Sequence, residues 1–549
     1  MGTGNEMENT SAFMVHHILK KRNISKQKQK HLNTLKQKKL NKIRLKKNQN
    51  QKKDQINQQL KNNVEDDSPN ELKSVNDTQF DTIIQQTNNS SSSFNTHFKN
   101  KTLFQWIIGS IKTDDFINNY WETKPLYISN DKNKFSILLS TVQIDELLIN
   151  NNIQYTKNID ITFYSDGVKE IHNLEGRVRP HVVWDFYCNK CSLRLLNPQT
   201  FVPNIHKLSS ELQEYFGCFI GCNAYLTPPN SQGFAPHYDD IEAFILQIEG
   251  RKRWKVYKPR IKYEELPRYS SENLNNDNIG EPVLEIILSE GDVLYLPRGY
   301  IHQASTENYH SLHITISAYQ RNAWIDLLEK IVPIAMEKAW KNDIEFRKGL
   351  PLHYLKVAGL GRVKECRKAR AKIKNNVKTL INKLTDHVYI DAAIDQLGTR
   401  FLYDALPPVL TEDEKMCTVF SGGLKMTANG IVKGLKEFQF QLNTEIALLR
   451  RYVSRFVKEK EENPKKKMKI VYRLYYTTDN SLEYHGEETS FLVIPKHFVE
   501  SIQYLFQNYP NFITISQLPC ENTEEKINLI ADLWERGIIR TQTPILLPD

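Results

Sequence analysis

Regular alternation of apolar and polar residues in the middle of the chain predicts β-strands. In segment 311–319, which reads SLHITISAY, apolar residues at positions 312, 314 and 316 alternate with polar residues at positions 313, 315 and 317. A period of two is typical of a strand with one polar face. Because the strand is otherwise apolar, we expect the polar face to line a cavity, although a solvated outer face would give the same pattern.

Two more strand-forming segments are predicted at residues 233–252 (GFAPHYDDIEAFILQIEGRK) and 291–304 (GDVLYLPRGYIHQA). Gly250 ends the first segment at a turn, and Lys252 then begins a further strand over residues 252–257. If that strand pairs antiparallel with the first, Lys252 points into the same barrel. A buried ammonium group there would suit a dicarboxylate cosubstrate.

Three residues of these segments form a candidate metal site. His237 and Asp239 are two positions apart, and in a strand such residues face the same side. His302, which follows a proline-glycine turn, can supply a third ligand. Two histidines and one carboxylate make up the facial triad of non-haem iron(II) oxygenases. A single His-x-Asp pair is more often a solvated histidine, so the assignment depends on the surrounding strands.

Helical periodicity follows the strands, in segments 323–340 and 362–384. The second segment has an apolar stripe, nine basic residues and one acid. Its basic face could contact nucleic acid, but a solvated face is the interpretation we favour.

The last 130 or so residues alternate short strands with helices. Strands are predicted at 470–476 and 490–494, and helices at 496–506 and 523–535. We expect Thr523 to cap the last helix, with Glu524 and Glu525 in its first turn.

The first 98 residues differ in composition, being rich in Asn, Gln, Lys and Ser. Between Lys20 and Lys53 there are fifteen Lys or Arg residues and no acid. Since the whole chain carries +10, the rest of it sums to −5. Such a segment cannot bury enough apolar surface to order itself. We expect a disordered tail that acts as a nuclear or nucleolar address and contacts RNA; a merely solubilising tail is the plainer alternative.

Cysteine usage and hydropathy limit the possible environment. Seven cysteines, an odd number, suit a reducing compartment. No apolar run is long enough for a membrane span, and we expect no secretory signal. The spacing of four cysteines permits a zinc site, but we favour buried free thiols: Cys188, Cys191, Cys218 and Cys222.

Together these motifs resemble those of JmjC-type, 2-oxoglutarate-dependent oxygenases of the cupin fold. The resemblance is closest to the nucleolar ribosomal-oxygenase branch, the bifunctional lysine-specific demethylases and histidyl-hydroxylases. It runs in order from about residue 100 to the C-terminus. The matching stretches are 116–128 (FINNYWETKPLYI), 192–198 (SLRLLNP), 223–225 (NAY), 237–252 and 296–319.

The resemblance implies an α+β fold built on a double-stranded β-helix, the cupin or JmjC core. The domains it implies are a disordered basic tail at 1–98, the JmjC oxygenase domain at 99–322, a helical dimerisation region at 323–420 and a winged-helix-like domain at 421–549. A winged helix often binds DNA, but in this family it resembles a protein-interaction element.

The resemblance also assigns roles to nine residues. It implies that His237, Asp239 and His302 bind one Fe(II) per chain. Lys252 corresponds to the lysine that binds the distal carboxylate of the cosubstrate 2-oxoglutarate. Polar cosubstrate contacts are implied for Asn223 and Thr315, and substrate contacts for Arg194, Tyr225 and Ser317.

The implied function is a protein oxygenase of the nucleus and nucleolus that takes part in ribosome biogenesis or chromatin and transcription regulation. We expect a homodimer that hydroxylates a histidine of a 60S ribosomal protein, large-subunit protein eight. The alternative is demethylation of lysines four and thirty-six of histone H3, with transcriptional repression as the outcome. Both reactions use the same oxidant, so the metal ligands cannot separate them.

Two observations rank these alternatives. Demethylation would call for an aromatic cage around a methylammonium group, and Tyr225 alone is thin support for one. A non-catalytic scaffold for chromatin or the ribosome is a third possibility, but a scaffold has no need of metal ligands.

Overall fold

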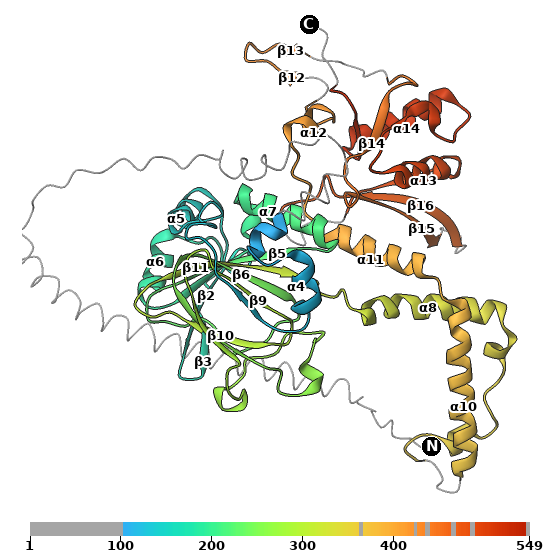
Figure 1. The fold of residues 1–549 in the computed structure, drawn as a ribbon. Helices are drawn as coiled ribbons and strands as arrows, with labels where there is room; N and C mark the ends of the chain where they lie inside the picture. The colour runs from blue at the N-terminus through green and yellow to red at the C-terminus, as the bar shows by residue number, and fades with distance from the viewer. Residues whose placement is uncertain are drawn as a thin grey trace, which may run out of the picture. The chain divides into compact units, whose positions relative to one another are not determined.

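Figure 1 shows the computed structural model of the chain. The structure describes residues 103–361, 366–421, 425–433, 440–462, 468–483 and 489–544. The predicted basic tail, 1–98, and the first four residues of the predicted helix 362–384 lie outside the described residues. Within the described residues, no helix is both long and apolar enough to cross a membrane.

Two antiparallel sheets form the oxygenase core. The larger sheet has eight strands in the order β1-β9-β6-β11-β5-β4-β2-β3, and the smaller has the order β10-β7-β8. The strands of the larger sheet are β1 (Leu126–Ile128), β2 (Ile159–Ser165), β3 (Val168–Ile171), β4 (Ser192–Leu196), β5 (Gly221–Thr227), β6 (Glu242–Gly250), β9 (Val293–Leu296) and β11 (Ser311–Ala318). Those of the smaller sheet are β7 (Lys252–Tyr257), β8 (Leu284–Leu288) and β10 (Ile301–Ser305).

Helices cover the outer face of the larger sheet (Figure 1). They are α4 (Thr113–Asn119), α5 (Thr141–Asn150), α6 (Pro180–Cys188) and α7 (Pro203–Phe216). Aromatic side chains fill the layer between these helices and the larger sheet. There the centroid of the Phe116 ring lies 4.8 Å from that of Tyr295 and 5.7 Å from that of Phe244. Burying such rings supplies much of the stability of the core.

Strand β11 lies in the middle of the larger sheet, between β5 and β6. Its apolar residues at 312, 314 and 316 are buried under the helices. The residues between them, His313, Thr315 and Ser317, line an internal cavity. The cavity-lining face predicted from the alternation is therefore confirmed, and the solvated face is excluded.

Two strand predictions were wrong in detail. Segment 233–252 becomes a regular strand only at Glu242, so His237 and Asp239 precede β6. In addition, β7 pairs with β8 and β10, not with β6. The cause lies at Gly250, whose φ of +64° turns the chain toward the other sheet. A Cβ atom there would lie 1.9 Å from the carbonyl oxygen of His310, so the turn requires glycine.

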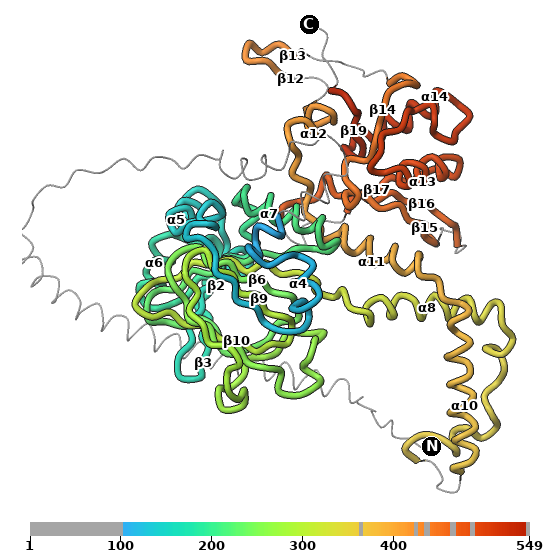
Figure 2. Tube along the Cα trace, in the orientation of Figure 1, coloured from blue at the N-terminus to red at the C-terminus, as the bar shows by residue number. Residues whose placement is uncertain are grey.

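Helices follow the core, and the periodicity predicted those over residues 324–342 and 367–384. They are α8 (Trp324–Asn342), α9 (Tyr354–Val357), α10 (Arg367–Leu384), α11 (Ile390–Asp404) and α12 (Glu412–Met416). Helix α10, traced in Figure 2, makes its main contacts with α8, α9 and the turn that follows it, and none of its residues is buried.

The C-terminal part has its own apolar core, which includes Leu448, Ile530 and Leu533. Its strands are β12 (Lys425–Met426), β13 (Val432–Lys433), β14 (Glu445–Leu448), β15 (Ser454–Glu462), β16 (Met468–Tyr476), β17 (Phe491–Ile494), β18 (Ile513–Thr514) and β19 (Ile539–Thr541). Its helices are α13 (Val499–Asn508) and α14 (Thr523–Glu535).

One capping prediction in this part was wrong. The residue that caps α14 is Asn522, not Thr523. The Asn522 side chain accepts hydrogen bonds from the backbone N–H groups of Glu524 and Glu525, at 3.0 and 3.3 Å. Asparagine is at least as good an N-cap as threonine, so the helix begins one position after it.

Candidate metal centre and its cavity

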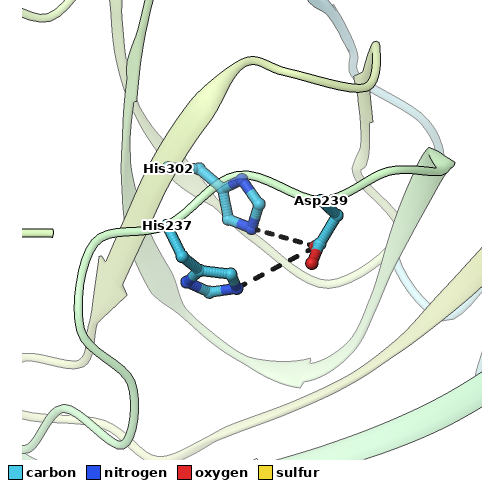
Figure 3. A group of neighbouring side chains, drawn as sticks. All are labelled: His237, Asp239 and His302. Carbon is cyan, nitrogen blue, oxygen red and sulfur yellow. Dashed lines mark ion pairs between the residues drawn. The ribbon is translucent and has the colours of Figure 1, made fainter. Parts of the chain in front are cut away.

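The three predicted metal ligands converge on one point (Figure 3). Their ligand atoms all lie within 4.8 Å of one another. The Asp239 Oδ2 atom is 3.6 Å from His302 Nε2 and 3.9 Å from His237 Nε2. Among the residues that the structure describes, this is the one such group of three or more histidine, cysteine or acidic side chains.

Backbone pairing holds the ligands in place. His237 and His302 face each other in an antiparallel bridge, in which the N–H of His302 donates to the His237 carbonyl at 2.8 Å and the reverse bond is 3.2 Å. The N–H of Gly299 donates to the Asp239 carbonyl at 3.0 Å. Since His302 belongs to β10 and the other two ligands lead into β6, the site joins the two sheets.

Hydrogen bonds also select the tautomer of both histidines. The Nδ1 atom of His237 is 2.8 Å from the Ala235 carbonyl, and that of His302 is 3.1 Å from the Tyr300 carbonyl. A carbonyl only accepts, so in the neutral ring Nδ1 carries the hydrogen and Nε2 presents its lone pair. Burial and the neighbouring His237 lower the pKa of His302 well below its ordinary value, which favours this neutral form.

All nine predicted site residues line a single cavity of about 430 Å³. They are Arg194, Asn223, Tyr225, His237, Asp239, Lys252, His302, Thr315 and Ser317. Asn223 and Thr315 are direct neighbours across β5 and β11. The roles assigned to the individual residues stay predictions.

A buried cation occupies one wall of the cavity. Lys252 is 5% exposed, and its Nζ atom donates to Thr227 Oγ1 at 2.9 Å. No carboxylate of the described residues forms an ion pair with it, and burial lowers its pKa to about 7. Although β7 belongs to the smaller sheet, Lys252 still points inward, because alternate residues of that strand face the interior. Such a group fits an anionic ligand.

His313 lies on the predicted cavity-lining face of β11, but the sequence analysis gave it no role. It is buried, and its Nδ1 atom has no hydrogen-bond partner among the described residues. Its ring stacks on Tyr225, with centroids 4.9 Å apart and planes 5° from parallel. Burial and nearby Lys252 lower its pKa well below the usual range. The polar face of the strand was the signal that placed it there.

A cationic wall lies beside Tyr225. Arg194 is held by Asp160 through a salt bridge, with Nε 3.2 Å from Oδ2. The Arg194 guanidinium and the Lys169 ammonium lie 5.5 and 4.6 Å from the centroid of the Phe234 ring. Phe234 also meets Tyr225 edge to face, at 5.6 Å.

Asp240 is a second acid of the cavity that the sequence analysis missed. Its carboxylate accepts hydrogen bonds from Ser270 Oγ at 2.7 Å and Gln320 Nε2 at 3.1 Å. Adjacent strand residues face opposite sides, so Asp239 and Asp240 were not expected to share a cavity. The segment before β6 is irregular, so both carboxylates line the cavity.

The zinc alternative is not supported. All seven cysteines are free, and no cysteine belongs to a metal-type cluster of the described residues. Three of the four candidate thiols are buried, as expected, but Cys188 is exposed at the end of α6.

Two histidines and an aspartate on one side of a cavity between two antiparallel sheets form the facial triad of non-haem iron(II) oxygenases. In agreement, the JmjC domain family matches residues 194–327. The family described as ribosomal oxygenase 1, C-terminal winged helix domain, matches residues 406–545.

Full-length relatives narrow the class to a family. The chain is 44% identical to ribosomal oxygenase 1 of Gallus gallus over 446 aligned residues. The alignment covers 81% of this chain and 72% of the relative. The chain is also 45% identical over 438 residues to bifunctional lysine-specific demethylase and histidyl-hydroxylase NO66 of Aedes aegypti, over 79% and 67% of the two chains. The chain therefore belongs to the ribosomal oxygenase 1 family and is an oxygenase. The solved structure of E. coli ycfD aligns with 79% of this chain and 99% of that chain, at a TM-score of 0.40 and 12% identity.

Proposed function

We propose that this enzyme uses Fe(II) and 2-oxoglutarate to hydroxylate a histidine side chain of a large-subunit ribosomal protein, large-subunit protein eight. One observation carries the proposal: three groups of side chains line the same cavity. They are the metal triad, the buried Lys252, which has no ion-pair partner among the described residues, and the hydrogen-bonding residues Arg194, Tyr225 and Ser317, here called the substrate wall. The relatives named histidyl-hydroxylase and ribosomal oxygenase support this choice of reaction.

The residues of the site fit both the metal and the cosubstrate. Two neutral imidazole nitrogens and one carboxylate oxygen are the donor set that Fe(II) takes in oxygenases. Lys252 offers a charge-assisted hydrogen bond to the distal carboxylate of 2-oxoglutarate, and Asn223 and Thr315 orient the molecule. Bound Fe(II), with 2-oxoglutarate and oxygen, supplies the oxidant that removes hydrogen from a C–H bond.

The substrate wall favours an imidazole over a methylated lysine. An imidazole both donates and accepts hydrogen bonds, and Arg194, Tyr225 and Ser317 offer matching groups. A methylammonium group would need free aromatic faces. At this wall, the Phe234 ring already has the cations of Arg194 and Lys169 against it. A third cation there would be repelled.

Mass spectrometry of peptides tests the proposal. A peptide of large-subunit protein eight with a histidine at its centre should gain one oxygen, roughly 16 Da, in the presence of Fe(II) and 2-oxoglutarate. His237→Ala should abolish both this gain and succinate formation while the core stays folded. Tyr225→Ala should weaken hydroxylation more than uncoupled 2-oxoglutarate decay, because it touches the substrate.

The competing reaction has a clear signature. Loss of methyl groups from lysine four or thirty-six of histone H3 peptides, with no mass gain on any ribosomal peptide, would replace hydroxylation with demethylation. A protein that binds Fe(II) but turns over no 2-oxoglutarate with any peptide would support the scaffold alternative.

We propose further that the enzyme is a homodimer of the nucleus and nucleolus. Support for the dimer comes from exposed apolar side chains on α8 and α10, among them Trp324, which is 82% exposed, Trp340, Val377 and Ile381. Exposed apolar surface on this scale is typical of an interface. The basic run between Lys20 and Lys53 supports the nucleolar address and a contact with RNA.

A further inference from the structure

A second hollow adjoins the metal cavity. It has a volume of about 400 Å³ and lies against the outward-facing side chains of β7 and β10. Gln303 and Ala304 line both spaces, so the two meet at the residues that directly follow His302. The hollow is not needed to bind the metal or the cosubstrate.

Amide and hydroxyl groups from four segments build this hollow. The Gln303 Nε2 atom donates to Tyr257 Oη at 2.8 Å and to Asn276 Oδ1 at 2.9 Å. From the segment before β6, Gln232 Nε2 comes within 3.4 Å of Gln303 Oε1. Gln303 is thus held at the rim by neighbours on both sides. A polar group fixed in this way can bind a ligand with little loss of side-chain entropy.

Charge in the hollow is balanced. Arg253 pairs with Glu307 at 2.6 Å and with Glu285 at 3.1 Å, and Lys255 lies 3.6 Å from Glu285. Two cations therefore face two acids, which leaves little attraction for phosphate groups or for a strongly acidic segment. The remaining groups both donate and accept hydrogen bonds, and this suits the N–H and C=O groups of a polypeptide backbone.

We propose that the hollow is an extended substrate subsite, which binds neutral polar residues on one side of the target residue in the substrate polypeptide. The inference rests on the proposed function, because it takes the substrate to be a polypeptide. The target side chain enters the metal cavity, and the chain continues over the rim at Gln303. The Asn276 Nδ2 group then donates to the flanking residues, and the Gln303 Oε1 atom accepts from them, because both hydrogens on Gln303 Nε2 are already donated within the hollow.

Peptide truncation combined with substitution tests the subsite. The full-length enzyme is assayed with three peptides. One is the long ribosomal peptide used above. The other two are shortened close to the histidine, one on its N-terminal side and one on its C-terminal side. In the wild type, trimming on one side only should raise KM roughly 3- to 10-fold, the effect of one or two hydrogen bonds, with kcat nearly unchanged.

Substitutions should reproduce this effect selectively. Asn276→Ala and Gln303→Ala should each raise KM for the long peptide by a similar factor. For the shortened peptide that already has a raised KM with the wild-type enzyme, both variants should give the same KM as the wild type. The matched control is Asn278→Ala, an exposed residue on the same turn, Asn276–Asn278, that does not line the hollow. It should have no effect.

Two results would overturn the inference. One is a KM that does not change when either flank is trimmed. The other is an equal effect of Asn276→Ala on long and trimmed peptides, which would indicate a general structural role. A wild-type enzyme that modifies none of the peptides would instead refute the proposed function, and the subsite with it.

Discussion

Lys252 is the residue at which folding and ligand binding oppose each other. The fold places its ammonium group inside the barrel with Thr227 as its hydrogen-bond partner. Burying a cation without a counter-charge is unfavourable, and the lowered pKa, about 7, reflects this. A bound dicarboxylate would supply the missing charge, so the cost of burial becomes a source of selectivity for an anionic cosubstrate.

Lys252→Ala should therefore raise the concentration of 2-oxoglutarate needed for turnover. A hydrogen bond to a charged group contributes about 1.5–3 kcal/mol, which corresponds to roughly a 10- to 150-fold change in affinity. Titration calorimetry with 2-oxoglutarate measures the loss. Lys258→Ala, an exposed lysine just beyond the same strand, is the matched control. An unchanged affinity in Lys252→Ala would place this lysine outside the cosubstrate site.

The same residue predicts a pH dependence. In the free protein the pKa of Lys252 is about 7, and a bound carboxylate raises it, so binding takes up a proton at pH values above 7. Affinity for 2-oxoglutarate should thus fall as pH rises through 7, by at most about tenfold per pH unit. Calorimetry in two buffers of different ionisation enthalpy should detect the proton uptake. Equal affinities at pH 6.5 and 8.5 would contradict it.

Individual residues were predictable where a short motif carried them. His237, Asp239 and His302 were found from spacing and a turn. Lys252, Thr315 and Ser317 were placed by strand patterns, and the resemblance supplied Arg194, Asn223 and Tyr225. His313 was placed on the cavity-lining face by the alternation, but without a role. Asp240 and Gln303 were not found, because Asp240 depends on an irregular backbone and Gln303 on a hollow between segments that are distant in the sequence. Neither is a local property of the sequence.

Helix α10 packs weakly against the described residues of its own chain. It has 18 residues, none of them buried, and seven basic residues with no acid. Like charges four positions apart, such as Arg370 and Lys374, destabilise a helix. Val377 and Ile381, one turn apart, remain about half exposed. A second copy of the chain that covers this apolar stripe would stabilise the helix.

Val377→Asp should accordingly dissociate the proposed dimer, because an unpaired carboxylate in an apolar interface costs several kcal/mol. Light scattering coupled to size exclusion gives the mass directly. Asn376→Asp adds the same charge at the next position, which faces about 100° away around the helix, and should leave the dimer intact. Wild-type protein that is monomeric at micromolar concentration would refute the dimer.

Elements were easier to predict than their pairing. The bounds of β11, α8 and α14 follow from periodicity, and each was placed within two residues. The partner of β7 was wrong because a turn such as Gly250 looks the same in a hairpin as in a crossover between sheets. Strand pairing depends on contacts between segments far apart in the sequence, and no local pattern records them.

For the whole molecule, charge is concentrated at one end. The run from Lys20 to Lys53 carries fifteen positive charges, while the rest of the chain sums to −5. Deleting residues 1–98 should leave hydroxylation of a short peptide intact and should disperse the protein from the nucleolus, since contacts with RNA scale with the number of cations. Imaging a fluorescent fusion, next to a peptide assay, checks both. A truncated protein that stays nucleolar would refute the addressing role.

Metal removal should weaken the barrel as a whole, because the ligands join its two sheets. A ligand present at 100 times its dissociation constant stabilises the native state by about 2.7 kcal/mol. For a core of this size, chelating the metal should lower the melting temperature by roughly 5–10 °C in scanning calorimetry. The His237→Ala variant should melt at the same temperature with and without the metal. If the melting temperature of the wild-type protein also does not change with the metal, the metal site does not stabilise the packing of the two sheets.

The metal site that joins the two sheets also bears on how long the enzyme survives in a cell. A barrel braced by its metal would open more often when iron is scarce, and proteases act on opened chains. A stability change of one or two kcal/mol is enough to alter protein abundance several-fold. Iron supply would then set the number of enzyme molecules as well as the activity of each one. A cell short of iron would then have fewer enzyme molecules, each with less activity.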